Sequence, residues 1–321
     1  MTRLLLAVVI FLSSIQVQAA KATKIVYAAP TTVAAAVMYI ANINGYFKAQ
    51  GIEVEEKLFS SGREAMDALL AGQAQLQSVS ETPLVLAVLQ GNNVVTIATT
   101  SAHEETKLIA RRDRGIQKET DLKGKKVATA PGTNSDYFMY VFLKGHGLSK
   151  KDIKVFNMKA PEMKTALVTG DIDAYFAWEP HIYYAKKELG DKAIVFNPGA
   201  RYHGRHTVNM NADFVKKNPE TVRKIVRALL QAEEFIRKNP EKAQELVAAK
   251  LKVDRVDLAQ MWREIDFKVQ LDEGVLPLYQ KIGHWFAEIN KREAPLPDFK
   301  QHIYSKALLE ERKSAVAPDL Q

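Results

Sequence analysis

Several apolar segments of the sequence end in small polar residues, at the point where a strand pattern changes to a helical one. The clearest example is the run 127–130, which is followed by Pro-Gly-Thr-Asn-Ser (131–135) and then by apolar residues at helical spacing. The first backbone N–H groups of a helix have no partner within the helix, and they attract negative charge. This loop therefore predicts a site for an oxyanion or a carbonyl group.

Similar loops follow other apolar segments, and ordinary helix capping is an alternative explanation for some of them. Ser61 and Glu64 have the spacing of a capping box, and Thr82 is expected to cap the helix that follows it. Because these loops lie at the carboxyl ends of the strands in each predicted sheet, we take their residues as candidate ligand contacts. The candidate ligand-binding residues are Thr31, Thr32, Ser61, Gly62, Ser80, Glu81, Gly132, Thr133, Asn134, Ser135, Trp178 and Glu179.

Two of these candidates are carboxylates, and they bear on the charge of the ligand. Glu81 and Glu179 would repel a bare inorganic anion, but they would favour a ligand with some positive charge or a hydrogen-bond donor. Glu81 also stands where an acid stabilises the dipole of a helix, which leaves its role open.

An aromatic ligand and an enzyme are the alternatives to a small oxyanion. Trp178, with Tyr27 and Tyr137, would suit stacking on a flat heteroaromatic such as a pyrimidine. Asp136 and Glu179 have the chemistry of an acid and base pair, but two acids at helix starts are the simpler interpretation.

The order of these segments is repeated within the chain. The pattern of 47–52, a strand, the stretch 68–72 and a strand ending at Pro83 returns as 143–148, a strand, the stretch 166–170 and a strand ending at Pro180. The intervals differ by only one or two residues. Two similar α/β lobes are therefore expected, each offering loops at the carboxyl ends of its strands.

Four segments together resemble a known family of binding proteins. They are Gly-Tyr-Phe-Lys-Ala-Gln-Gly-Ile-Glu-Val (45–54), Ser-Gly-Arg-Glu-Ala-Met-Asp-Ala-Leu-Leu-Ala-Gly (61–72), Leu-Lys-Gly-Lys-Lys-Val-Ala (122–128) and Phe-Ala-Trp-Glu-Pro (176–180). In this order they resemble the periplasmic solute-binding proteins of nitrate, sulfonate and taurine ABC importers and their pyrimidine-binding relatives. The resemblance implies a type II-like two-lobed fold and capture of a small solute between the lobes, without catalysis. It also implies partners: a membrane permease and, indirectly, its ATPase.

The chain order predicts how the lobes are built. We expect lobe one to comprise 24–107 and the C-terminal helices of 206–313, and lobe two to comprise 112–200, with two crossovers between them that form a hinge. Asn-Pro-Glu at 218–220 and at 239–241 predicts helix starts, and Asp254 predicts another. Aromatic residues of this region are expected to pack against lobe one, namely Trp262, Phe267, Trp285 and Phe286. The tail 314–321 is expected to be disordered.

Composition excludes other classes of function. The chain has no cysteine, and its net charge of +8 is spread over lysine-rich helices without a basic and aromatic patch, so we expect no nucleic-acid partner. The common hydrolase, zinc protease and nucleotide motifs are missing from the sequence, and we expect no cofactor. His203 and His206 are three residues apart, but no carboxylate in their loop completes a metal site.

Residues 1–19 have the pattern of a secretory signal. Arg3 precedes the apolar run 4–12, and Val-Gln-Ala (17–19) has the form of a cleavage site. Nine apolar residues are far fewer than the roughly 20 that cross a bilayer. We expect cleavage after about Ala19 and a monomer in the periplasm, with an uncleaved N-terminal anchor as the alternative.

Overall fold

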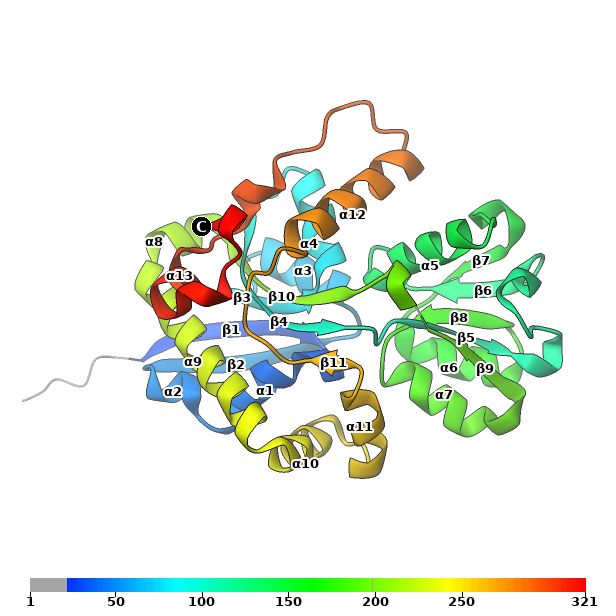
Figure 1. Cartoon of the computed structure of the whole chain (residues 1–321), viewed down its shortest axis with the longest axis horizontal. Helices are drawn as coiled ribbons and strands as arrows, with labels where there is room; N and C mark the ends of the chain where they lie inside the picture. The colour runs from blue at the N-terminus through cyan, green and yellow to red at the C-terminus, as the bar shows by residue number, and fades with distance from the viewer. Residues whose placement is uncertain (1–21, 198) are drawn as a thin grey trace, which may run out of the picture.

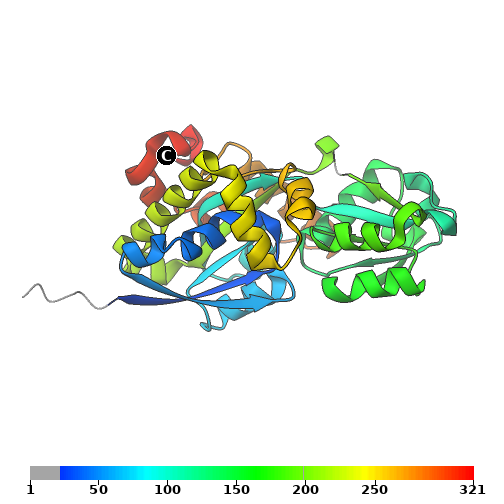
Figure 2. The same ribbon diagram turned by 90° about the horizontal axis from the view of Figure 1, so that it is seen from below.

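The computed structural model describes residues 22–197 and 199–321, and it contains two β-sheets, each flanked by helices (Figures 1 and 2). The predicted signal segment 1–19 lies outside the described residues. The first sheet has the order β11-β4-β10-β3-β1-β2 and the second has the order β7-β6-β8-β5-β9. The two-lobed α/β architecture predicted from the sequence is confirmed, but the lobe bounds shift slightly. Lys107, predicted in lobe one, begins β5 of the second sheet, and the return to the first sheet begins at Gly204 and not at 206.

The strands of the first sheet are β1 (Thr23–Pro30), β2 (Ile52–Phe59), β3 (Leu76–Ser80), β4 (Val94–His103), β10 (Gly204–Asn211) and β11 (Ile265–Asp266). Those of the second are β5 (Lys107–Arg111), β6 (Lys126–Thr129), β7 (Lys154–Asn157), β8 (Ala174–Ala177) and β9 (Ala193–Phe196). The internal repeat is visible in the topology. In each sheet three parallel strands, β2-β1-β3 and β7-β6-β8, are continued by an antiparallel strand, β10 or β5.

Lobe one carries the helices that precede the first crossover and those of the C-terminal region. They are α1 (Ala36–Ile43), α2 (Tyr46–Ala49), α3 (Gly62–Leu70), α4 (Glu81–Leu89), α8 (Ala212–Lys217), α9 (Pro219–Lys238), α10 (Pro240–Leu251), α11 (Arg255–Trp262), α12 (Val275–Ile289) and α13 (Lys306–Arg312). Lobe two carries α5 (Asn134–Gly145), α6 (Ala160–Thr169) and α7 (His181–Leu189). Among the described residues, none of these helices has the length and apolar character needed to cross a bilayer.

Within the described part of the chain, the lobes are connected by 104–106, between β4 and β5, and by 199–203, between β9 and β10. Figures 1 and 2 show both running through the narrow region between the sheets. A pair of short connections of this kind permits hinge motion of one lobe against the other.

Local sequence signals explain most helix starts. Ser61 accepts a hydrogen bond from the Glu64 N–H, Asp254 accepts one from the Val256 N–H, and the predicted helices after Asn218 and Asn239 are present. One prediction is wrong: α4 begins at Glu81 with Ser80 at the N-cap, so Thr82 lies inside the first turn. Its hydroxyl donates to the Glu81 side chain, which removes it from capping.

The C-terminal region differs from the prediction in two ways. Residues 313–320 form two short 3-10 turns, and Ala317 N–H donates to the Leu271 carbonyl at 2.8 Å. Because Val316 and Leu320 are buried, this tail is packed and not disordered. Trp285 does not pack only on lobe one, since its ring lies 5.3 Å from that of Tyr137 in lobe two.

Candidate ligand-binding site between the lobes

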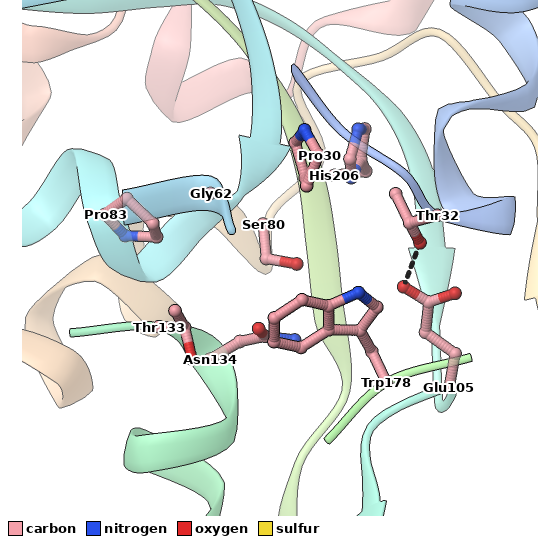
Figure 3. A pocket seen from close by; sticks show the side chains of 10 residues that line it. All are labelled: Pro30, Thr32, Gly62, Ser80, Pro83, Glu105, Thr133, Asn134, Trp178 and His206. Atoms are coloured by element: carbon pink, nitrogen blue, oxygen red, sulfur yellow. Dashed lines mark hydrogen bonds between the residues drawn. The ribbon is translucent and has the colours of Figure 1, made fainter. Parts of the chain in front are cut away.

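A small pocket lies between the lobes, with a cavity volume of about 10 Å³. This volume holds about one water molecule, so a larger ligand would require the lobes to move apart. Figure 3 shows its walls, which come from the helix starts of both lobes, from the connection 104–106 and from strand β10. The pocket is lined by Pro30, Thr32, Gly62, Ser80, Pro83, Glu105, Thr133, Asn134, Trp178 and His206.

Three helices begin at this pocket. Gly62 is the first residue of α3, Ser80 is the N-cap of α4, and Thr133 is the N-cap of α5. Thr133 caps its helix by accepting from the Ser135 N–H, whereas the Ser80 hydroxyl makes no capping bond. The positive ends of three helix dipoles and a free hydroxyl therefore face the same space, which suits an anionic group.

Glu105 brings a carboxyl group to the same pocket. Its Oε1 accepts a hydrogen bond from the Thr32 hydroxyl at 2.8 Å, and its Oε2 has no partner among residues 22–197 and 199–321. The side chain is 1% exposed, and burial raises the pKa of Glu105 to about 8. The carboxyl thus has one oxygen fixed and one oxygen open to a donor.

His206 and Trp178 add two neutral polar groups. The His206 Nε2 lies 2.6 Å from the Ser78 hydroxyl, and burial lowers the pKa of His206 to about 3, which keeps the ring neutral. In the described part of the chain, neither the His206 Nδ1 nor the Trp178 Nε1 has a hydrogen-bond partner. Buried groups of this kind cost free energy unless they are satisfied, so a polar ligand would pair them.

The two kinds of group lie at opposite ends of the pocket. Figure 3 shows Thr32 and Glu105 on one side, and Ser80, Thr133 and Asn134 on the other. The indole of Trp178 lies across the space between them. Among the described residues, no lysine or arginine lines the pocket.

Half of the predicted contacts line this pocket: Thr32, Gly62, Ser80, Thr133, Asn134 and Trp178. The others lie nearby in structural roles. Ser61 caps α3, and the Ser135 hydroxyl lies 2.8 Å from that of Thr133. Gly132 has φ +71° and donates its N–H to Asp136, and Thr31 does not line the pocket.

The two predicted carboxylates bind other parts of the protein. Glu81 is fully buried, and it accepts from the Tyr202 hydroxyl at 2.6 Å and from the Arg205 N–H at 2.9 Å. Glu179 pairs with Lys107 at 3.0 Å. Both carboxylates are satisfied by these partners, and Glu105 takes the place that was predicted for them.

The predicted aromatic cluster is not formed. Trp178 lines the pocket, but Tyr27 is buried in the core of lobe one. Tyr137 contacts Tyr202 and Trp285 in another core. The pocket therefore has one aromatic wall.

Sequence reasoning missed Glu105, His206, Pro30 and Pro83. Glu105 and His206 stand on or beside the connections between the lobes, where no strand-to-helix pattern marks them. The only sequence signal was their position at the predicted hinge. Pro30 ends β1 and Pro83 lies in the first turn of α4. Both prolines therefore stand at transitions from a strand to a helix, and the same sequence pattern could have predicted them.

Comparisons with known proteins identify relatives of this chain. The chain is 26% identical over 196 residues to the taurine-binding periplasmic protein of Escherichia coli, and the match spans 60% of each chain. It is 25% identical over 269 residues to a putative binding protein of Brucella abortus, which covers 80% of this chain and 82% of that one.

A solved structure with the same fold is the alkanesulfonate-binding protein SsuA from Xanthomonas axonopodis pv. citri, bound to MOPS. Its TM-score is 0.77 at 15% identity, and the match covers 89% of this chain and all of that one. The fold is therefore that of the periplasmic binding proteins. Residues 33–243 match the model of the family described as NMT1/THI5 like, and the chain belongs to that family.

Proposed function

We propose that this protein is the extracytoplasmic solute-binding component of an ABC importer, and that it captures a small zwitterion with a sulfonate and an ammonium group. The observation that carries the proposal is the two-ended pocket. Three helix starts face one end, and the half-paired carboxyl of Glu105 occupies the other. A taurine-like molecule has one anionic and one cationic group, which match the two ends of the pocket in charge.

The charge distribution disfavours a bare anion. A nitrate ion would meet the helix starts but would leave the Glu105 Oε2 without a partner. A simple alkanesulfonate would do the same. An ammonium group would pair that oxygen and would hold Glu105 ionised, because a neighbouring positive charge lowers the pKa of a carboxyl.

The alternatives have less support. A pyrimidine would have only Trp178 to stack on, since Tyr27 and Tyr137 lie elsewhere. An enzyme is disfavoured because the two acids suggested for catalysis, Asp136 and Glu179, each form an ion pair with a lysine. Asp136 pairs with Lys150 at 2.9 Å and Glu179 pairs with Lys107, and neither acid lines the pocket.

The proposal includes the setting of the protein. A periplasmic monomer would release its ligand to a membrane permease driven by an ATPase. The taurine-binding relative is named as periplasmic, and the N-terminal sequence has the pattern of a secretory signal. The hinge between the lobes would let the pocket open for release.

A thermal-shift panel tests the proposal. The purified protein, refolded to remove any bound solute, is melted with taurine, ethanesulfonate, nitrate or uracil. A ligand at one hundred times its Kd adds about 2.7 kcal/mol, which raises the midpoint by several degrees. We expect the largest shift with taurine and a smaller one with ethanesulfonate. A shift with uracil alone would support the heteroaromatic alternative and overturn the zwitterion, and consumption of a ligand would identify an enzyme.

A further inference from the structure

Three carboxylates of the C-terminal region each form an ion pair with a lysine of lobe two. The pairs are Asp257 with Lys187 at 2.7 Å, Glu264 with Lys107 at 2.5 Å, and Glu288 with Lys144 at 3.2 Å. We call these three acids the C-terminal clasp. All of them lie after residue 243, the end of the family match.

The first pair joins α11 to α7. Asp257 also accepts from the Tyr183 hydroxyl at 2.5 Å, so each of its two oxygens has a partner on lobe two. The residue is 7% exposed although it lies on a surface helix. Both partners come from α7, which fixes one edge of lobe two against α11.

The pair of Glu288 with Lys144 joins α12 to α5 on the other side. Glu288 accepts from the Tyr140 hydroxyl at 2.5 Å and from Lys144. The same helix is anchored in lobe one, where the Tyr279 hydroxyl lies 2.6 Å from that of Thr96. Figure 1 shows α11 and α12 on opposite sides of the connections between the lobes, so the two pairs hold lobe two from two directions.

The pair of Glu264 with Lys107 lies between the other two, beside the hinge. Lys107 is 8% exposed in its side chain and contacts both Glu264 of lobe one and Glu179 of lobe two. Burial alone would lower the pKa of Lys107, but the two carboxylates raise it and keep the amine charged. Because Glu179 follows Trp178, this chain of charges reaches the wall of the ligand pocket.

We propose that the C-terminal clasp sets the balance between open and closed lobes. Opening the hinge would separate Asp257 from α7 and Glu288 from α5. These ion pairs would therefore stabilise the closed form and not the open form. An ion pair of this kind changes an equilibrium by about two- to fivefold, so the two pairs that opening separates change the closed-to-open ratio by about four- to twenty-fivefold. The inference concerns closure and does not depend on which ligand is bound.

Distance measurement by electron spin resonance tests it without any ligand. Because the native chain has no cysteine, one cysteine can be placed on each lobe for spin labels, at the exposed residues Gln73 and Glu162. The clasp variant D257N/E264Q/E288Q is compared with the control variant E188Q/E234Q/E245Q. The control removes the same charge from ion pairs that lie within one lobe.

We expect the clasp variant to show a longer and broader distance between the labels, and the control to match the parent protein. High salt should move the parent part of the way toward the clasp variant, since salt screens the exposed Glu288 and Lys144 pair more than the buried Lys107 pair. Equal thermal midpoints and circular dichroism spectra establish that both variants are folded. Coincident distances for the clasp and control variants would overturn the inference, whatever the result of the ligand panel.

Discussion

At the scale of single residues, the chemistry of the pocket depends on Glu105. The carboxyl is buried, one oxygen accepts from Thr32, and the other is open to a donor. Its pKa is raised to about 8, mainly by burial. Burial therefore makes this carboxyl costly to ionise unless a cation pairs with it.

This raised pKa predicts a pH dependence of stability. The unfolded state loses the Glu105 proton at an ordinary pKa and the folded state only at about 8, so stability falls with rising pH across that window. Glu105→Gln keeps an acceptor for Thr32 but cannot ionise. Urea unfolding of both proteins without ligand should give similar free energies at pH 5. At pH 8.5 the variant should be more stable, by on the order of 4 kcal/mol. A difference that does not change with pH would show that Glu105 does not titrate in this way.

The residue types and their loops were sufficient to predict part of the pocket. Thr32, Gly62 and Thr133 were found because helix starts have a local sequence signal. Glu105 and His206 were not found, since their role depends on which segments the hinge brings together. The acids at 81 and 179 were assigned to the ligand because the sequence does not show their buried partners.

At the scale of elements, two serines at helix starts have different tasks. Ser61 accepts from the Glu64 N–H and caps α3, while Ser80 stands at the N-cap of α4 without a capping bond and lines the pocket. The same residue type is therefore structural in one helix and open to a ligand in the other.

This contrast predicts that one of two matched substitutions lowers stability and that the other weakens ligand binding. Ser61→Ala should lower the free energy of unfolding by about 1 kcal/mol, because a cap is lost. Ser80→Ala should change stability by less than about 0.5 kcal/mol, but it should weaken taurine and ethanesulfonate binding alike by about tenfold, the value of one hydrogen bond to an anion. Urea unfolding and calorimetric titration of both variants measure the two effects. A stability loss for Ser80→Ala as large as that for Ser61→Ala would contradict the assignment.

The C-terminal tail is an element that the sequence did not reveal. Val316 and Leu320 are buried, and the backbone pairs with Leu271 on both sides, through its N–H and its carbonyl. The tail is short and follows a charged helix, so composition alone suggested disorder.

Its packing predicts the effect of truncation. A chain that ends at Lys313 would expose Leu271 and lose the burial of two large apolar side chains, each worth about 1.5–3 kcal/mol. We expect a loss of several kcal/mol in urea unfolding and a lower thermal midpoint. The double substitution Val316→Ala and Leu320→Ala should reproduce most of this loss. An unchanged midpoint after truncation would mean that the tail does not contribute to stability.

At the scale of the whole molecule, the internal repeat predicted two lobes, and the matching strand orders β2-β1-β3 and β7-β6-β8 confirm it. The repeat carries no information on how the C-terminal helices reach lobe two. The contacts of Asp257, Glu264 and Glu288 join residues far apart in the sequence, and no local pattern encodes them. Two lobes, a hinge and a pocket with unlike ends nevertheless give one consistent account: closure around a small zwitterion.

The most direct test of this account is a binding cycle with two proteins and two ligands. Calorimetric titration at pH 8 gives the Kd of taurine and of ethanesulfonate for the parent protein and for Glu105→Gln. We predict that the parent prefers taurine and that the variant loses this preference by a factor on the order of 30 or more, the cost of removing one partner of a buried charge pair. Ethanesulfonate affinity should be retained or improved. An equal taurine preference in both proteins would contradict the claim that Glu105 binds the cationic end of the ligand.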